Sequence, residues 1–376
     1  MGLSYLFTIS TFCGIWRPLS WSSRFKKVLY NMYSVFVVCM NVTFTISQII
    51  SVLTVDNLDD FAENTYMLVP AIVCCCKLIN LLVYRGGIIE LVKIFLEEPC
   101  ATLNDKEELI QMRYDKQIRT NIIKYTRMVK SSTVMILFTS FLNDFRNGRL
   151  TYRAWIPYNY SSTTAFGLTY IHQMMALAIA GYVHLACDVL LCGLLSQICC
   201  QFDILQCRLN EVKKNETIAL RECVRHHNRI YKLAAMVNDT LNLTIFAQFF
   251  GSFLALCLSL IKLIKENTLS TQVISLLFFV VMIMTQSFLY CWYGNEVTLK
   301  SIAVADMIFQ MNWIETNEQA KKILIITMSR SRSPIQLETA HVMTCDLDFF
   351  VAVSNNFVDI KCTHMCTFGI HVSYGT

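Results

Sequence analysis

Residues 267–295 read NTLSTQVISLLFFVVMIMTQSFLYCWYGN and contain no Lys, Arg, Asp, Glu or His. At about 1.5 Å of rise per residue, a helix of this length crosses the roughly 30 Å hydrocarbon core of a bilayer. This run decides the class of the fold. The chain is predicted to be an all-α membrane protein.

The composition of the whole chain agrees with this prediction. Of 376 residues, 55% are hydrophobic and 16% charged, and the mean hydropathy is +0.46, outside the range of soluble domains. The 17 Cys lie mostly inside apolar runs, where Cys behaves as a small buried hydrophobe and not as part of a disulfide framework. The basic group Arg17, Arg24, Lys26 and Lys27 follows the first apolar segment instead of preceding it, which argues against a cleaved signal peptide.

Further apolar runs predict a polytopic helical bundle, a single seven-transmembrane domain over residues 1–376 without internal repeats. Lys77 and Asp188 interrupt the second and fourth runs, and three basic residues occupy one end of the third, from which they can reach the interface. The predicted spans are 28–53, 66–84, 121–142, 166–202, 240–261, 267–295 and 347–365.

The distribution of basic residues predicts the orientation. Of the 32 Lys and Arg residues, 25 fall in the N-terminal segment and in alternate loops, including the basic end of the third span. Basic residues accumulate on the cytoplasmic side, so the N-terminus is predicted to be cytoplasmic and the C-terminus extracellular. The acidic loop 55–65 and the glycosylation sequon at Asn159 both fall on the outer side in this scheme.

The motifs exclude several classes of protein. The sequence contains no Walker loop, no Gly-x-Ser-x-Gly, no His-Glu-x-x-His and no Gly-x-Gly-x-x-Gly, so we expect neither an enzyme nor a cofactor nor a nucleic-acid partner. Cys362, His364 and Cys366 offer three metal ligands without a fourth, so no metal site is predicted. His226 and His227 are expected on a solvated helical extension of the fifth span, with no catalytic role.

Three stretches resemble one family, the insect odorant receptors. They are GIWRPLSWSSRFKKVLYNMYSVFV (14–37), LTYRAWIPYNYSSTTAFGLTYIHQ (150–173) and WYGNEVTLKSIAVADMIFQMNWIETNEQAKKILIITMSRSRSPIQLETA (292–340). The third is the most specific, with Tyr293, Gly294, Asn295, Trp313, Lys321, Lys322, Met328, Arg330, Ser331 and Pro334 in register. The likeness extends to about Phe357, and Ser333 departs from the basic residue that usually precedes the proline.

The resemblance implies an odorant receptor in the plasma membrane of olfactory sensory neurons. Such receptors are subunits of ligand-gated, nonselective cation channels that detect small volatile molecules and assemble as heterotetramers with an obligate co-receptor. A cytoplasmic helix, here 300–337, would form the subunit contact through Trp313, Ile323, Met328 and Arg330. Apolar residues recur among charges in this segment and need cover, either from a partner subunit or from the bilayer surface.

The family's ligand pocket lies in the outer halves of spans two, three, four and six. Aromatic and Met side chains there offer an adaptable apolar surface, although many such residues only pack within a bundle. The candidates for ligand contact are Tyr66, Met67, Phe138, Phe141, Tyr170, Met174, Phe278 and Phe279.

The C-terminal segment departs from the family. By the resemblance, Val353, Phe357, Thr363 and His364 would lie along the pore and its gate, but residues 358–376 match nothing in the family pattern. Asp359 and Lys361 precede the gate position, and each charge costs roughly 2.5 to 3.5 kcal/mol if it faces lipid. We therefore expect an atypical replacement tail and a defective seventh helix.

Several alternatives stay open at this stage. A gustatory receptor subunit would share the architecture, and a receptor with a defective pore helix would be non-functional. The distribution of basic residues argues against a G-protein-coupled receptor, and the lack of repeated halves argues against a secondary transporter. Lys77 and Asp188 fit intramembrane transport charges, or they sit near the cytoplasmic ends of their spans or pair within the bundle.

Overall fold

The computed structural model describes residues 3–17, 21, 23–54, 58–212, 217–265, 271–310, 316–339, 343–348, 350–352 and 354–355, which are almost entirely helical, as predicted. The long helices are α2 (Arg24–Leu53), α3 (Leu58–Val83), α5 (Asp105–Asn143), α6 (Thr163–Glu211), α7 (Thr217–Lys265) and α8 (Thr271–Gln310). The shorter elements are α1 (Leu3–Phe12), α4 (Arg85–Leu96), the 3-10 helix η1 (Phe145–Asn147), α9 (Glu318–Ser331) and the strands β1 (Glu338–Thr339) and β2 (Met343–Thr344).

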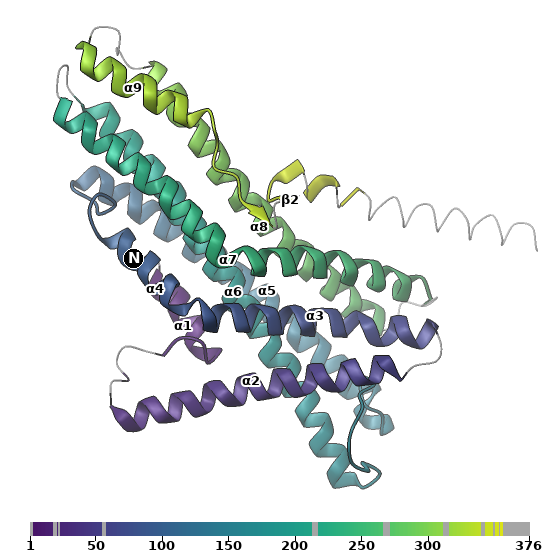
Figure 1. The fold of residues 1–376 in the computed structure, drawn as a ribbon. Coiled ribbons are helices and arrows are strands. Elements are labelled where there is room, and N and C mark those ends of the chain that lie inside the picture. Colours follow the sequence, from purple (N-terminus) through teal and green to yellow (C-terminus); the bar gives the residue numbers. More distant parts are fainter. Residues whose placement is uncertain are drawn as a thin grey trace, which may run out of the picture.

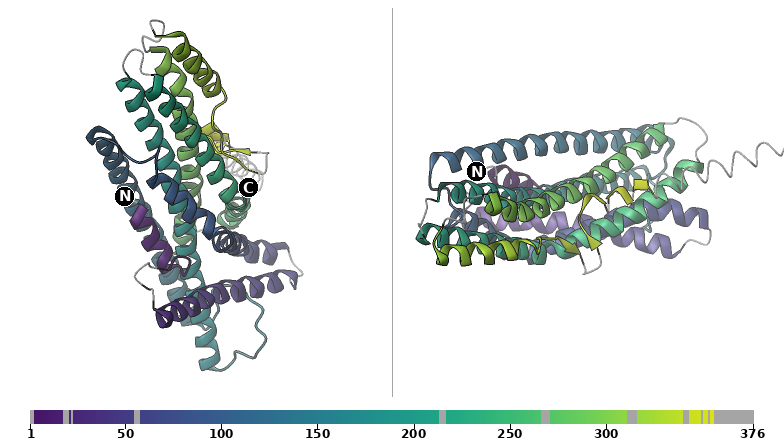
Figure 2. Two further views of the ribbon diagram at one scale, coloured as in Figure 1. Left: turned by 60° about the vertical axis from the view of Figure 1, so that its left-hand side comes forward. Right: turned by 90° about the horizontal axis from the view of Figure 1, so that it is seen from above.

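Helix α6 is the centre of the bundle. Every residue from Leu185 to Phe202 is buried, which requires neighbours on all sides of the helix. Helices α5, α7 and α8 pack along α6, and α1, α2 and α3 contact it as they cross. Figure 1 shows α6 passing through the middle of the molecule, and the left view of Figure 2 shows α2 lying across the longer helices.

Several described helices overlap predicted spans, whereas most of the predicted span 347–365 lies outside the described residues. Five of them, α2, α3 from Thr65, α6, α7 and α8, are long and apolar enough to cross a membrane. The basic third span lies within α5, and the count of seven spans stays a prediction. The α2–α3, α5–α6 and α7–α8 connections define the end called outer here, after the predicted orientation. At the inner end, α6, α7, α8 and α9 project beyond α2 and α3 (Figure 1).

The helix predicted over 300–337 is wrong in its bounds. Its first part continues α8 to Gln310, and a separate helix, α9, begins at Glu318. The side chain of Asn317 caps α9 by accepting a hydrogen bond from the backbone N of Ala320 at 2.7 Å. Asn and Asp favour this position because their short polar side chains satisfy the free backbone N–H groups of a first turn.

The predicted solvation of His226 and His227 is also wrong, since both side chains are buried. The Nε2 atom of His226 lies 2.8 Å from Oε1 of Gln201 on α6. The ring of His227 packs against Tyr231, 4.8 Å between centroids. The two histidines face the neighbouring helices, while exposed charges such as Arg225 occupy the other face of α7.

An ion pair ties the inner parts of α5, α6 and α7 together. Arg208 on α6 donates to Glu107 through Nε at 2.9 Å and Nη2 at 2.8 Å, and its Nη1 lies 3.2 Å from Nδ1 of His226. Glu107 also accepts from the backbone N of Leu103 at 2.9 Å, and its own backbone N donates to the side chain of Asn104, the N-cap of α5, at 2.9 Å. The bidentate Arg208–Glu107 ion pair holds α5 against α6 at the inner end, and the contact of Arg208 with His226 adds α7.

Gly294 allows the strand segment to lie against α8. A Cβ at this position would overlap the carbonyl oxygen of Cys345, which follows β2. The backbone N of Cys345 in turn donates to the carbonyl of Leu337 at 2.9 Å. The glycine in the Tyr-Gly-Asn motif is therefore explained by close backbone approach.

The orientation of the chain can be tested by glycosylation. Asn159 is exposed in the α5–α6 connection, and a second sequon, Asn215-Glu216-Thr217, lies in the α6–α7 connection at the opposite end. We expect Asn159→Gln to abolish an endoglycosidase-sensitive mobility shift and Asn215→Gln to leave it unchanged. Loss of the shift in Asn215→Gln alone would reverse the predicted orientation.

Candidate functional site

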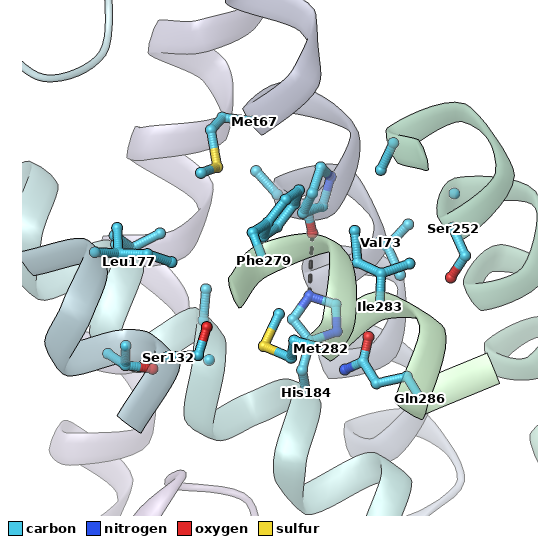
Figure 3. A pocket seen from close by; sticks show the side chains of 18 of the residues that line it. Met67, Val73, Ser132, Leu177, His184, Ser252, Phe279, Met282, Ile283 and Gln286 are labelled. Atoms are coloured by element: carbon cyan, nitrogen blue, oxygen red, sulfur yellow. Dashed lines mark hydrogen bonds between the residues drawn. The ribbon is translucent and has the colours of Figure 1, made fainter. Parts of the chain in front are cut away.

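A mostly apolar cavity lies between α2, α3, α5, α6, α7 and α8 in the outer half of the bundle. We call it the inner cavity because it lies deeper in the bundle than a second cavity at the outer end; the name does not refer to the inner end of the helices. The volume of the inner cavity is about 80 Å³. Figure 3 shows Met67 at one end of this cavity and His184 and Gln286 at the other. The lining comprises Phe44, Met67, Pro70, Ala71, Val73, Ser132, Thr133, Ile136, Leu177, Ala180, Gly181, His184, Gln248, Gly251, Ser252, Ala255, Phe279, Met282, Ile283 and Gln286.

Three buried polar atoms in this lining have no hydrogen-bond partner among the described residues: Oγ of Ser132, Nδ1 of His184 and Oε1 of Gln248. His184 uses its other ring nitrogen, Nε2, to donate to the carbonyl of Pro70 at 3.2 Å (Figure 3), so Nδ1 of the neutral ring is left as an acceptor. A buried polar atom without a partner costs about 1–3 kcal/mol. The inner cavity is therefore suited to a small apolar molecule that brings a hydrogen-bonding group.

Gln286 on α8 connects the inner cavity to a buried charge. Its Oε1 accepts from Nε2 of Gln248 at 3.1 Å, and its Nε2 donates to Oδ2 of Asp188 at 2.8 Å. Gln248 also donates to Oγ of Ser252 at 2.7 Å. A chain of amide hydrogen bonds thus runs from the cavity wall on α7 to a carboxylate at the centre of α6.

Asp188 collects donors from three other helices. Its carboxylate accepts from Nζ of Lys77 on α3 at 2.6 Å, from the hydroxyl of Tyr125 on α5 at 2.6 Å and from the hydroxyl of Tyr290 on α8 at 2.7 Å. The side chains of Lys77 and Asp188 are both 0% exposed. Of the alternatives for these two charges, the structure supports pairing within the bundle. We call Lys77, Tyr125, Asp188, Gln286 and Tyr290 the Asp188 cluster.

The predicted ligand-contact residues lie in different environments in the structure. Met67 and Phe279 line the inner cavity, whereas Tyr66 lines an adjoining cavity at the outer end. Oγ of Ser140 forms hydrogen bonds with the hydroxyl of Tyr170 at 2.8 Å and with Sδ of Met174 at 3.4 Å. The remaining three aromatic residues do not line either cavity and are exposed at the bundle surface: Phe138 at 56%, Phe141 at 48% and Phe278 at 42%.

Sequence reasoning missed the polar residues of the lining, because a single Ser, His or Gln in an apolar run does not indicate the direction in which its side chain points.

Of the predicted subunit-contact residues, Ile323 and Met328 pack against the chain's own core, and Arg330 stacks on the ring of Tyr231 at 5.0 Å. Trp313, Val353, Phe357, Thr363 and His364 lie outside the described residues. Within the described part of the chain, no group of His, Cys, Asp or Glu is arranged to hold a metal ion.

Comparison with known proteins gives a consistent result. A sequence model of the family described as 7tm Odorant receptor matches residues 57–358. Odorant receptor 94a of Drosophila melanogaster is 25% identical over 80% of this chain and 79% of its own length, and odorant receptor 2a of the same fly is 24% identical over 90% of each. In fold, the chain is similar to the insect olfactory receptor OR5 from Machilis hrabei in complex with eugenol, with a TM-score of 0.83, 15% identity and 95% of each chain covered.

The Asp188 cluster gives a stability prediction. Asp188→Asn leaves the Lys77 ammonium buried without a counter-charge, which costs roughly 3–5 kcal/mol. We expect the purified variant to melt at a markedly lower temperature in detergent, measured by fluorescence-detected size exclusion. Adding Lys77→Met is expected to recover part of this loss, because the stranded charge is removed.

The matched control is the exposed pair Lys106–Glu211, whose side chains are 73% and 40% exposed. Glu211→Gln should leave the melting temperature unchanged. If Asp188→Asn behaves like this control, the buried pair does not stabilise the bundle.

Proposed function

The chain belongs to the insect odorant receptor family, and from that premise we propose that it is the odorant-binding subunit of an odorant-gated cation channel. The gustatory alternative is set aside, because the relatives are odorant receptors. The chain is thus an odorant receptor with several membrane-spanning helices. We further infer that it acts in the plasma membrane of olfactory sensory neurons and carries out no enzymatic reaction.

The inner cavity carries the proposal for the odorant site. It combines a wall of Met, Phe and aliphatic side chains with a few inward polar atoms, the combination expected of a small-molecule site. Flexible Met67 and Met282 can adapt to ligands of different shape. Because the receptor OR5 was solved in complex with eugenol, we expect a small volatile molecule in this cavity.

Assembly with an obligate co-receptor as a heterotetramer is the second part of the proposal. At the inner end, Ile302 and Phe309 on α8 are 41% and 70% exposed, and Ile325 and Ile326 on α9 are 52% and 66% exposed. Apolar side chains gathered on neighbouring helices outside the predicted spans favour a partner surface. We assign the subunit contact to these four residues together with Arg330, in place of Ile323 and Met328, which pack internally.

The pore and its gate stay a prediction. The family match ends at residue 358, where the atypical tail 358–376 begins. The departure of the tail from the family also stays a prediction, and it leaves the assignment of the odorant site and the subunit contact unchanged.

Adjacent phenylalanines on α8 test the odorant site. Phe279 is 4% exposed and lines the inner cavity, whereas Phe278 is 42% exposed on the outside of the bundle. With the co-receptor co-expressed and agonists found in a panel of volatiles that includes eugenol, we expect Phe279→Ala to raise the EC50 of whole-cell currents roughly tenfold or more. A tenfold change is about 1.4 kcal/mol of lost contact.

Phe278→Ala is the matched control and should keep the wild-type EC50. Surface expression of both variants is measured by biotinylation, so that a folding defect is recognised. Equal effects of the two substitutions would remove the inner cavity as the odorant site.

Substitution at the exposed inner face tests the subunit contact. We expect Ile326→Asp to reduce co-purification with the co-receptor more than tenfold, because it removes roughly 1.5–3 kcal/mol of apolar burial and places a charge in the interface. Leu109→Asp on α5 is the control, since Leu109 is also exposed, at 60%, but lies on another helix of the inner end. Equal losses in both variants would contradict a specific contact at α9.

A further inference from the structure

A second cavity lies at the outer end, between the ends of α3, α5, α7 and α8 and the α5–α6 connection. We call it the outer cavity, and its volume is about 130 Å³. Its lining is mainly polar and includes Tyr66, Thr139, Asp144, Thr151, Tyr152 and Lys262. Such a lining favours water, so the outer cavity differs in chemistry from the apolar cavity beside it.

The two cavities share three lining side chains: Met67 on α3, Ile136 on α5 and Phe279 on α8. We call these three residues the partition. Met67 has an unbranched, flexible side chain, and the ring of Phe279 meets the ring of Tyr66 edge-on at 6.3 Å between centroids. A partition made of side chains on three different helices can open by rotamer changes, without movement of the backbone.

Charge in the outer cavity is balanced. Nζ of Lys262 lies 4.3 Å from the ring centroid of Tyr66, and Asp144 is attracted by the same ammonium group. Burial raises the pKa of the Asp144 carboxyl, while the Thr151 hydroxyl, Lys262 and Arg149, which is not in the lining, oppose this shift. With one potential anion and one cation in the lining, the outer cavity favours a neutral polar group over a net charge of either sign.

The inner cavity adds a matching restriction. Among the described residues, no Lys, Arg, Asp or Glu lines it, so an ionised ligand would lose its hydration without gaining a counter-charge. Its unpartnered acceptors on His184 and Gln248 suit a hydroxyl donor. Both compartments therefore select the same chemistry, a neutral molecule with an apolar body and a hydrogen-bonding group.

We propose that the outer cavity is a hydrated entry compartment that receives neutral alcohols or phenols from the aqueous side and admits them to the inner cavity past Met67, Ile136 and Phe279. This inference rests on the proposed odorant site. It adds a route, a partition and a ligand class to that site.

Cysteine accessibility tests the route without any agonist. Ser275 lines the outer cavity and Ser132 the inner cavity, so Ser275→Cys and Ser132→Cys place a thiol in each compartment with little change in volume. The full-length chain at the cell surface is treated with methyl methanethiosulfonate, a small neutral reagent whose sulfur the thiolate attacks, releasing methanesulfinate. Peptide mass spectrometry then follows positions 132 and 275 separately from the native cysteines.

We expect modification at position 275 to be fast and at position 132 to be slow. Met67→Ala removes part of the partition and should speed modification at position 132 at least tenfold without changing position 275. Phe279→Ala, on a different helix, should do the same and serves if the first variant folds poorly. Ile72→Ala is the matched control: it truncates an α3 side chain that is 41% exposed on the bundle surface, and it should change neither rate.

Unchanged modification at position 132 in both partition variants would overturn the route and indicate entry through the lipid. An anionic reagent, 2-sulfonatoethyl methanethiosulfonate, should modify position 275 more slowly than the neutral reagent does and should not modify position 132. Equal modification of both positions by this reagent would overturn the ligand class. Neither result depends on odorant currents, so failure of this inference is distinguishable from failure of the proposed odorant site.

Discussion

A buried carboxylate at the centre of α6 constrains the whole bundle. Asp188 sits in a low-dielectric interior, where an ionised group is tolerated only with a counter-charge and a full set of hydrogen-bond donors. Those donors come from α3, α5 and α8, so the axial position and the rotation of each of these helices relative to α6 are fixed. A network that is fully satisfied specifies a unique packing, since any sliding of a helix would strand a charge.

The location of the inner cavity follows from this constraint. His184 lies one helical turn before Asp188 on α6, and Gln286 both lines the cavity and donates to Asp188. Through Gln286, the Asp188 cluster therefore forms one end of a space whose other walls include Met, Phe and small residues. A rigid polar base with an adaptable apolar wall suits recognition of small, mainly apolar molecules.

The sequence predicts the general fold but only part of the site. Long charge-free runs and the distribution of basic residues predict the membrane class, and the motif residues around Tyr293 predict the family. The direction in which each side chain points is not predicted by hydropathy. Phe278 and Phe279 are neighbours in one apolar run, yet the helix turns by about 100° per residue, so that the first is exposed and the second is buried. Because α6 and α8 are apolar on nearly all sides, hydropathy cannot tell their buried face from their lipid face. The burial of His226 and His227 escaped prediction for the opposite reason, since their charged neighbours on α7 suggested a solvated helix.

We propose that an odorant binds in the inner cavity, on the outer side of the Asp188 cluster. The most direct test is a cryo-electron microscopy structure of this chain assembled with the co-receptor and a saturating agonist. We expect ligand density in contact with Phe279 and within hydrogen-bond distance of Ser132, His184 or Gln248, with the four donors still on Asp188. Ligand density elsewhere on the chain, with the inner cavity empty, would contradict it.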